Sequence, residues 1–281
     1  MKYRNLIPEK LWFILLGLVG IIAGSIIITT FNSSSTYNSS SNVCTRVVDS
    51  NPTINQLNAI LHYATSKTRP QQSKQEITVS FDILKLLSPC NFLVFGLGFD
   101  SQMWAAFNPR GTTLFLEEDP EWVQTVLKDA SFLHAHTVTY RTELHEADDL
   151  IKSYRNVPSC LPGNAYVNGN TGCKLALTNL PDEVYDKEWD LIMIDAPKGY
   201  FPEAPGRMGA IWTAAVMARN RKGPGVTHVF LHDVNRKVEK MFAMEFLCEK
   251  YLVKSVGRLW HFEIPSMANV SSSVISQKSF C

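Results

Sequence analysis

The sequence predicts an α/β fold of the Rossmann type, a mostly parallel sheet flanked by helices, placed behind one N-terminal transmembrane helix. Three observations support it. Residues 91–119 read as strand, glycine turn, helix, turn, strand and acid, which is one βαβ unit of a nucleotide-binding sheet. Three buried-looking apolar runs each end in an acid, at Glu117, Asp195 and Asp233. An uncharged apolar run from 11 to 28 is long enough to span a bilayer.

The N-terminal region divides the chain into four parts. We expect a cytosolic tail at 1–10, a signal anchor at 11–30, a Ser/Asn-rich lumenal stalk at 31–52 and a catalytic domain at 53–281. Lys2, Arg4 and Lys10 precede the apolar run and no comparable basic flank follows it, so the N-terminus is expected in the cytosol. This is the topology of a single-pass type II protein, expected in the Golgi membrane. Cleavage as a signal peptide near Gly24 is the alternative.

All six cysteines follow the apolar run, on the expected lumenal side. An even number of cysteines in an oxidising compartment predicts disulfides. Cys160 and Cys173 bracket a Pro/Gly/Asn-rich loop and form the clearest pair, while two further pairs are expected between Cys44 and Cys90 and between Cys248 and Cys281. Free buried thiols are the alternative. Glycosylation sequons begin at Asn32, Asn38 and Asn269.

The first βαβ unit holds the expected cofactor residues. The apolar run 92–95 is followed at once by Gly96 and Gly98, and 101–107 has the composition of a short helix with Asp100 or Ser101 as its N-cap. Glycines let the backbone approach a ligand, and the helix N–H groups face it. We therefore expect Gly96, Gly98 and Asp100 to bind a nucleotide cofactor.

The second strand, expected at 112–116, ends in three consecutive acids. Asp119 before Pro120 reads as an N-cap followed by proline at the first helical position, so Asp119 is assigned to capping. Glu117 stands directly after the strand, where a carboxylate can accept from both ribose hydroxyls. We predict Glu117 as the ribose ligand; the alternative is that these acids only solvate the strand end.

The remaining elements follow from periodicity. Helices are expected at 55–64, 73–87, 120–128, 146–154 and 238–251, and further strands at 136–140, 191–194, 227–231 and 253–264, the last as one or two closing strands. A net charge of +1 gives no footprint for nucleic acid. The sequence has no Cys-x-x-Cys or Cys/His cluster that indicates zinc.

Six sequence runs resemble one narrow family. They are LVFGLG, LFLEEDPEWV, WDLIMIDAPKGYFPEAPGRM, MARNRK, VFLHDVNR and FLCEKY. They resemble the plant polysaccharide O-methyltransferases, which include the glucuronoxylan 4-O-methyltransferases, over roughly residues 53–265. PDEVYDKEWD, YFPEAPGRM and SVGRLWHFEIP are most similar to the arabinogalactan-directed members. Two positions depart from the common class I methyltransferase motif, because Val94 stands where an acid is usual and Asp100 where a third glycine is usual.

The resemblance implies both a fold and an activity. It implies the class I S-adenosylmethionine-dependent methyltransferase fold and methyl transfer to the 4-hydroxyl of glucuronic acid on arabinogalactan, as in arabinogalactan proteins. The acceptor partner is then a polysaccharide or proteoglycan. Methylation of glucuronoxylan is the first alternative. A non-catalytic cell-wall assembly protein is the second, since the departures around Gly96 are compatible with lost cofactor binding.

Catalytic candidates lie at the ends of two later strands. A sugar hydroxyl is a poor nucleophile, so a base or a metal is expected near it. Asp195, His232 and Asp233 are the candidate bases, and Asp195 is also expected near the cofactor. His232 as a purely structural hydrogen-bonding residue is the alternative. Asp195 and Asp233 can instead hold one divalent cation through oxygen ligands.

Three residues after Asp195 are expected to bind the anionic acceptor. Arg207 follows a Pro/Gly loop and suits bidentate capture of a carboxylate. Lys198 adds a second cation, and Tyr200 is expected to stack on a sugar ring, with core packing as its alternative.

Overall fold

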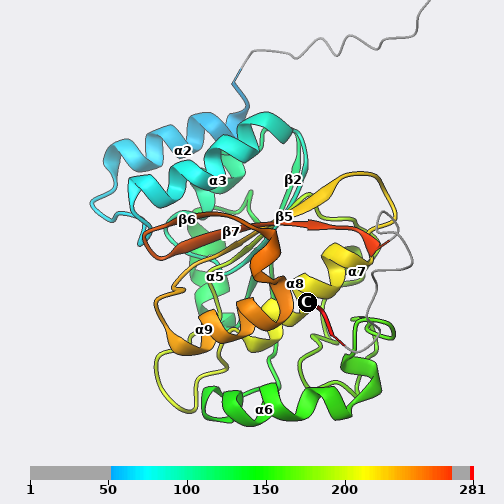
Figure 1. Cartoon of the computed structure of the whole chain (residues 1–281). Coiled ribbons are helices and arrows are strands. Elements are labelled where there is room, and N and C mark those ends of the chain that lie inside the picture. The colour runs from blue at the N-terminus through cyan, green and yellow to red at the C-terminus, as the bar shows by residue number, and fades with distance from the viewer. Residues whose placement is uncertain (1–51, 268–278) are drawn as a thin grey trace, which may run out of the picture. The chain divides into compact units, whose positions relative to one another are not determined.

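The computed structural model describes residues 52–267 and 279–281, which belong to one compact unit spanning 51–281. Its centre is a seven-stranded sheet (Figure 1). The strands are β1 (Asn91–Phe95), β2 (Thr112–Glu117), β3 (His134–Thr137), β4 (Leu191–Ile194), β5 (Val226–Leu231), β6 (Leu252–Val256) and β7 (Leu259–Pro265). Their order is β3-β2-β1-β4-β5-β7-β6.

The first five strands are parallel, whereas β7 is antiparallel to both β5 and β6. The order in which strands are added to the sheet reverses between β1 and β4. The strands β2 and β3 lie on one side of this switch point, and β5 lies on the other. This is the doubly wound Rossmann-like arrangement, whose ligands bind at the carboxyl ends of the strands beside that switch point. It confirms the predicted α/β fold.

Helices cover both faces of the sheet. One face carries α3 (Lys74–Leu87), α4 (Ser101–Phe107) and α5 (Pro120–Asp129), with α2 (Ile54–Thr65) packed on α4. The other carries α6 (Ala147–Ser153), α7 (Asp182–Asp186), α8 (Met208–Arg219) and α9 (Lys237–Phe242). Successive residues of β1 and β4 alternate between these two cores, which explains why both strands are apolar without interruption.

Local sequence signals set the helix starts. Thr53 and Ser73 each form a capping box with the residue three positions on, at the starts of α2 and α3. The predicted cap of α5 is confirmed, because the Asp119 side chain accepts from the backbone N–H groups of Glu121 and Trp122.

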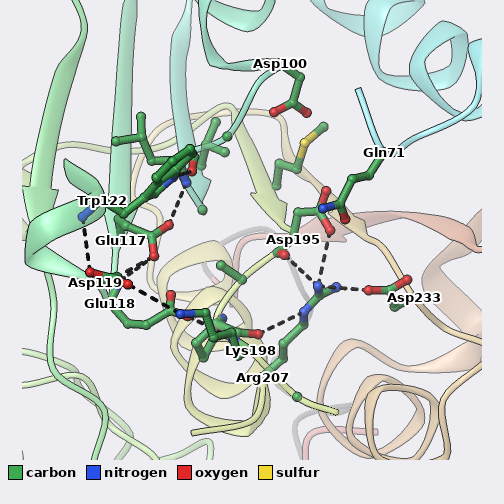
Figure 2. Close-up of a pocket in the computed structure, with 18 of the residues that line it drawn as sticks. Gln71, Asp100, Glu117, Glu118, Asp119, Trp122, Asp195, Lys198, Arg207 and Asp233 are labelled. Carbon is green, nitrogen blue, oxygen red and sulfur yellow. Dashed lines mark hydrogen bonds and ion pairs between the residues drawn. The ribbon is translucent and has the colours of Figure 1, made fainter. Parts of the chain in front are cut away.

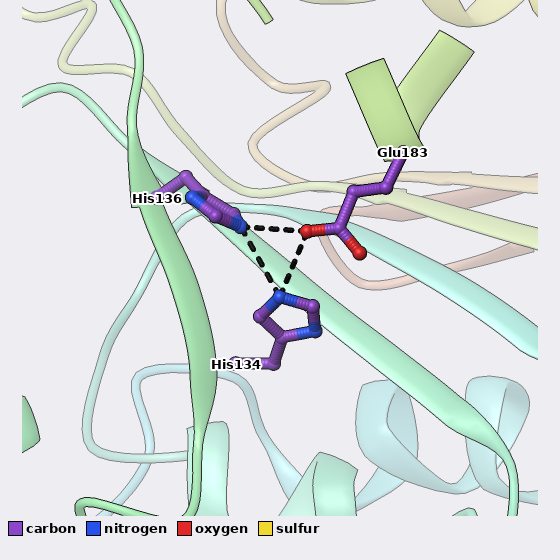
Figure 3. A group of neighbouring side chains, drawn as sticks. All are labelled: His134, His136 and Glu183. Atoms are coloured by element: carbon purple, nitrogen blue, oxygen red, sulfur yellow. Dashed lines mark hydrogen bonds and ion pairs between the residues drawn. The ribbon is translucent and has the colours of Figure 1, made fainter. Parts of the chain in front are cut away.

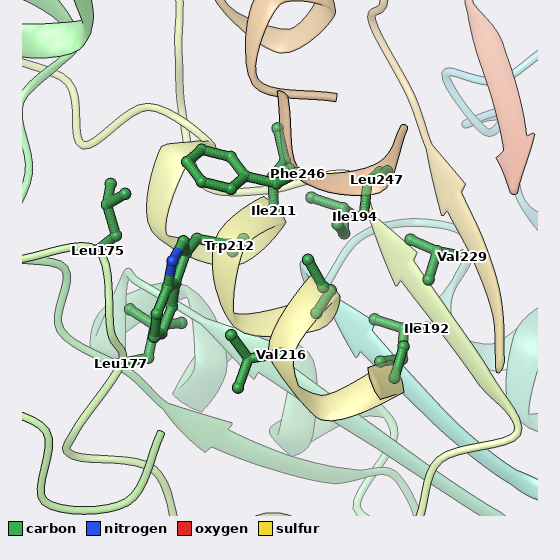
Figure 4. Close-up of a cluster of buried hydrophobic side chains, with 14 of the residues drawn as sticks. Leu175, Leu177, Ile192, Ile194, Ile211, Trp212, Val216, Val229, Phe246 and Leu247 are labelled. Carbon is green, nitrogen blue, oxygen red and sulfur yellow. The ribbon is translucent and has the colours of Figure 1, made fainter. Parts of the chain in front are cut away.

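Helix α8 is almost completely buried (Figure 4). Eleven of its twelve residues are buried, as expected for a helix that is apolar on all sides. The segment that includes Leu175 and Leu177 covers it, and the indole of Trp212 donates to the carbonyl of Cys160 at 3.2 Å. The predicted Cys160–Cys173 disulfide closes the loop that directly precedes this segment.

The cysteine predictions are confirmed where the structure describes both partners. Cys248 and Cys281 form a second disulfide, which ties the C-terminus to the chain beyond α9. Cys90 is a buried free thiol, and its expected partner Cys44 lies outside the described residues.

Two predicted elements were wrong in extent. The third strand ends at Thr137 and not at Tyr140, because its partner β2 ends at Glu117, which is in register with Thr137. The helix expected over 238–251 is broken into α9, a π-helical turn at Ala243–Leu247 and a 3₁₀ turn at Glu249–Tyr251. Cys248 lies between the two turns with φ of 76°, which no right-handed helix accommodates.

None of the helices within 52–267 and 279–281 is long and apolar enough to cross a membrane. The predicted anchor at 11–30, the stalk and all three sequons lie outside these residues.

Candidate active site

The carboxyl ends of β1, β2, β4 and β5 open into a pocket of about 440 Å³ (Figure 2). The pocket brings together nine residues expected at the site from sequence, namely Gly96, Gly98, Asp100, Glu117, Asp195, Lys198, Tyr200, Arg207 and Asp233. His232 is the exception, because it does not line the pocket. The sequence therefore predicted nine of the 21 residues that line this pocket.

The glycine turn after β1 forms one wall. Gly96 has φ of +124°, and a Cβ added there would lie 3.2 Å from the Cβ of Ala196, so glycine alone fits this approach of two strand ends. The Gly98 N–H donates to Ser101 Oγ at 2.9 Å. Asp100 accepts from the indole of Trp104 at 2.8 Å, and burial, together with the charge of Asp195, raises the pKa of Asp100 to about 6.

Glu117 is a buried carboxylate held by backbone N–H groups. One of its oxygens accepts from Leu97 at 2.9 Å, and the other from Glu118 and Asp119 at 3.1 and 3.2 Å. Burial and the adjacent Glu118 carboxylate raise the pKa of Glu117 to about 8. One oxygen of Glu118 accepts from the Lys198 N–H at 3.0 Å, while Glu118 Oε2 is buried without a hydrogen-bond partner. This end of the pocket therefore offers acceptors to a ligand.

Asp195 is the carboxylate at the centre of the pocket. Its Oδ1 lies 2.8 Å from His232 Nδ1 and 3.2 Å from an Arg207 nitrogen, and its Oδ2 accepts from the Gln72 amide at 3.1 Å. Burial opposes ionisation, but the hydrogen bond from His232 and the charge of Arg207 outweigh it and lower the pKa of Asp195. A fully ionised carboxylate therefore faces the pocket at neutral pH.

His232 lies behind Asp195 and away from the pocket. Its side chain is only 1% exposed. Since an ionised carboxylate can only accept, His232 Nδ1 carries the proton that it donates to Asp195. The opposite nitrogen, Nε2, has no hydrogen-bond partner and lies 3.8 Å from Glu76. The imidazole therefore orients the Asp195 carboxylate and favours its ionised form, from the side away from the pocket.

Asp233 and Arg207 form a buried charged network. Asp233 has φ of 60°, rare for a residue with a side chain, and its carboxylate pairs with Arg207, Arg236 and Arg258 at 3.0, 2.9 and 2.6 Å. Arg207 is 4% exposed and also donates to the backbone carbonyls of Asp195 and His232. The guanidinium of Arg207 is therefore occupied by contacts within the protein. The expected capture of a substrate carboxylate would require these contacts to break.

The Asp195, His232 and Asp233 donor atoms lie within 4.8 Å of one another, which makes them one candidate metal site. One nitrogen of Arg207 contacts carboxylate oxygens of both Asp195 and Asp233. A cation is therefore already present where a metal would lie. These residues do not fit the predicted divalent cation.

Aromatic and cationic groups surround the mouth of the pocket. Tyr200 is 69% exposed and its ring contacts that of Phe201 edge to face. Lys198 is half exposed, with its ammonium 3.5 Å from Asp119. On the cofactor side, the rings of Phe99 and Trp122 meet with centroids 5.7 Å apart, and Trp122 donates to the Leu97 carbonyl.

Sequence reasoning missed several residues of the site. Gln72 reaches it from the segment before α3, and Arg258 from the turn between β6 and β7. No local motif marks either of them. Glu118 belongs to the acidic run after the second strand and Trp122 to the helix expected at 120–128, and neither was predicted as a pocket residue.

Comparison with known proteins identifies the family. The IRX15/IRX15L/GXM family model matches residues 75–262. Arabinogalactan O-methyltransferase 2 of Arabidopsis thaliana is 60% identical over 95% of this chain and 94% of its own, and arabinogalactan O-methyltransferase 1 is 57% identical over 99% and 100%. Glucuronoxylan 4-O-methyltransferase 1 of the same organism is 49% identical over 79% of this chain and 78% of its own.

Among solved structures, a methyltransferase-like protein from Silicibacter pomeroyi has 13% identity and a TM-score of 0.38, covering 70% of this chain and 89% of that one. The family match extends over most of the described residues and includes every strand that contributes to the pocket. The chain belongs to the IRX15/IRX15L/GXM family.

Proposed function

We propose that this protein is an S-adenosylmethionine-dependent O-methyltransferase that methylates the 4-hydroxyl of glucuronic acid on arabinogalactan. The observation that carries this proposal is the extent of the similarity. Identity of 57–60% with two arabinogalactan O-methyltransferases runs over almost the whole chain, whereas identity with the glucuronoxylan enzyme is 49% over 79% of it. Glucuronoxylan is therefore the second candidate acceptor.

The pocket lining fits S-adenosylmethionine. The cofactor carries positive charge, and the cofactor side of the pocket presents Asp100, Glu117 and Glu118, with an unpartnered buried oxygen on Glu118. Gly96 and Gly98 would hold the cofactor from the backbone side, with Glu117 at its ribose and Phe99 and Trp122 beside its base. When bound, S-adenosylmethionine supplies an electrophilic methyl group on a positively charged sulfur.

Asp195 is the group proposed to touch the acceptor hydroxyl. Its carboxylate is ionised, lines the pocket and is fixed by His232, Gln72 and Arg207. A hydrogen bond to Asp195 would orient the hydroxyl for in-line attack. As the oxygen gains a methyl group its proton becomes strongly acidic, so a carboxylate of lowered pKa is a sufficient acceptor for it. The proton leaves the sugar oxygen and protonates Asp195.

Arg207 and His232 are positioning residues in this proposal. Arg207 balances the charges of Asp195 and Asp233, and His232 donates to Asp195 from behind. Lys198 is the proposed contact for the glucuronic acid carboxylate, since its ammonium is half exposed at the mouth, and Tyr200 would stack on a sugar ring. No catalytic step is assigned to a metal, because Arg207 fills the place between the carboxylates.

The decisive experiment is methyl transfer onto two acceptors side by side. Purified protein and labelled S-adenosylmethionine are incubated with de-methylated arabinogalactan and with de-methylated glucuronoxylan, and 4-O-methylglucuronic acid is measured in each. Faster transfer to arabinogalactan supports the proposal, and faster transfer to glucuronoxylan selects the second candidate. Cofactor binding without transfer to either would reject both and favour an assembly role. A chelator arm should leave turnover unchanged.

We also propose a type II Golgi topology with the catalytic domain in the lumen. The apolar run at 11–28 and its basic flank support it, as do two disulfides, which persist in oxidising compartments. In intact vesicles the C-terminal domain should be protected from added protease. Digestion from the cytosolic side would reject this topology.

A further inference from the structure

Three donor atoms converge on one point at the sheet edge, away from the pocket (Figure 3). His134 and His136 are two residues apart on β3, so their side chains lie on the same face of the strand. Glu183 reaches them from α7. His134 Nε2 and His136 Nε2 each lie 2.9 Å from Glu183 Oε1, and 3.2 Å from each other. None of the three lines the pocket.

We propose that His134, His136 and Glu183 form a zinc-binding site that fastens the edge strand β3 to α7. Two imidazoles and a carboxylate are a common donor set for Zn²⁺, and nitrogen donors favour zinc over calcium or magnesium. Bonds of about 2.0–2.1 Å in a tetrahedral site place neighbouring donors roughly 3.3–3.4 Å apart. The observed triangle has to widen by only a few tenths of an ångström.

Exposure allows this adjustment and leaves room for a fourth ligand. The three side chains are 46%, 34% and 31% exposed, so each can shift slightly and water can complete the coordination. Hydrogen bonding alone would direct both imidazole N–H groups at one carboxylate oxygen and hold the two nitrogens 3.2 Å apart. One cation replaces both protons and satisfies all three donors together. A metal link to α7 would also protect β3, an edge strand of four residues, from pairing with another chain.

The test uses the purified full chain, stripped of metal with a chelator and titrated with ZnCl₂. We expect saturable binding of one zinc ion and a rise in the thermal midpoint on binding. His136→Ala and Glu183→Gln should each weaken zinc affinity by more than about 100-fold, since even loss of an outer partner of a ligand costs 10- to 100-fold.

His145→Ala is the matched control. His145 is also an exposed histidine beside a carboxylate, Glu143 at 3.3 Å, but it has no second imidazole, so its loss should leave zinc affinity unchanged. S-adenosylmethionine affinity should stay the same in His136→Ala, which separates this site from the pocket. The proposal fails if the wild type binds no zinc, or if affinity survives in both His136→Ala and Glu183→Gln. It also fails if Asp195→Asn is the variant that removes the ion.

Discussion

Within the described residues, two of the clusters of histidine and carboxylate groups differ in what balances their charge. At the pocket, Asp195 and Asp233 share a buried arginine, Arg207, and His232 supports them from behind. At the sheet edge, Glu183 meets two half-exposed imidazoles. Burial explains the difference. A pair of carboxylates removed from water needs a cation supplied by the protein itself, whereas an exposed cluster is stabilised by solvent and can bind a cation from it.

The comparison shows that residue types alone do not define a metal site. Both groups have donor atoms within 4.8 Å of one another. Only the geometry shows that a guanidinium nitrogen contacts both carboxylates at the pocket, so these candidate metal ligands are already paired with a cation. Four predictions test these assignments at the pocket.

The largest effect is expected for Asp195→Asn. The amide cannot accept the proton of the acceptor hydroxyl, so the methyl-transfer rate should fall by about 10²- to 10⁴-fold, the usual cost of losing a general base. Single-turnover transfer and equilibrium cofactor binding should be measured together, and cofactor affinity should change little. Asp186→Asn, on the exposed end of α7, is the control. Near-normal turnover in Asp195→Asn would remove this residue from the chemistry.

Replacing Arg207 should mainly reduce stability. Arg207→Met leaves Asp195 and Asp233 buried without their shared cation, and breaking a buried ion pair from one side typically costs about 3–5 kcal/mol. Chemical denaturation measures the loss. Arg155→Met is matched to it, because Arg155 is half exposed in its pair with Glu245 and should contribute at most about 1 kcal/mol. Equal losses in the two variants would contradict the buried network.

Much of the fold was predictable because its signals are local. Unbroken apolar runs marked β1 and β4, Asp119 before Pro120 marked the start of α5, and the Cys160–Cys173 loop marked its own disulfide. The strand-end rule then placed Glu117, Asp195 and Asp233 at the pocket correctly. Where β3 stops was not predictable from its own residues, because the end of its partner β2 decides it.

The missed parts depend on contacts between distant segments. His232 carries no local mark that it lies behind Asp195, and Gln72 is more than one hundred residues away from the carboxylate it contacts. Cys-x-x-Cys and Cys/His patterns, which indicate zinc in a sequence, do not include this site. The His-x-His pair at 134 and 136 was visible, but its third donor, Glu183, is brought to it only by the packing of α7 beside the sheet edge.

The acidic end of the pocket is tested by Glu117→Ala. If Glu117 holds the ribose, its loss should weaken S-adenosylmethionine binding by about 10- to 150-fold, corresponding to roughly 1.5–3 kcal/mol for a charged hydrogen bond. Isothermal titration measures it. Glu118→Gln keeps the shape of the Glu118 side chain and tests whether its unpartnered oxygen, Oε2, contacts the cofactor. An unchanged affinity in folded Glu117→Ala, with a loss in Glu118→Gln, would move the ribose contact to Glu118.

The smallest expected effect is the pH dependence of stability and of cofactor affinity that arises from Glu117. Burial and Glu118 raise the pKa of Glu117 to about 8, so in the free protein the protonated form is favoured by folding. The contribution of Glu117 to stability is therefore full below its ordinary pKa near 4.5 and declines as the pH rises towards 8. Ribose hydroxyls bind a carboxylate better than a neutral acid, so cofactor affinity should change in the opposite direction.

The expected rise in affinity between pH 6.5 and 8 is at most about 10-fold per pH unit. The amino group of the cofactor also titrates in this range, so the informative quantity is the ratio of wild-type affinity to that of Glu117→Gln at each pH. That ratio should increase with pH and level off above 8. Glu118→Gln removes the neighbouring charge that raises the pKa of Glu117, and should shift the rise to lower pH. A ratio that stays flat from pH 6 to 9 would mean that Glu117 is already ionised, and that the Glu118 carboxylate does not suppress its charge.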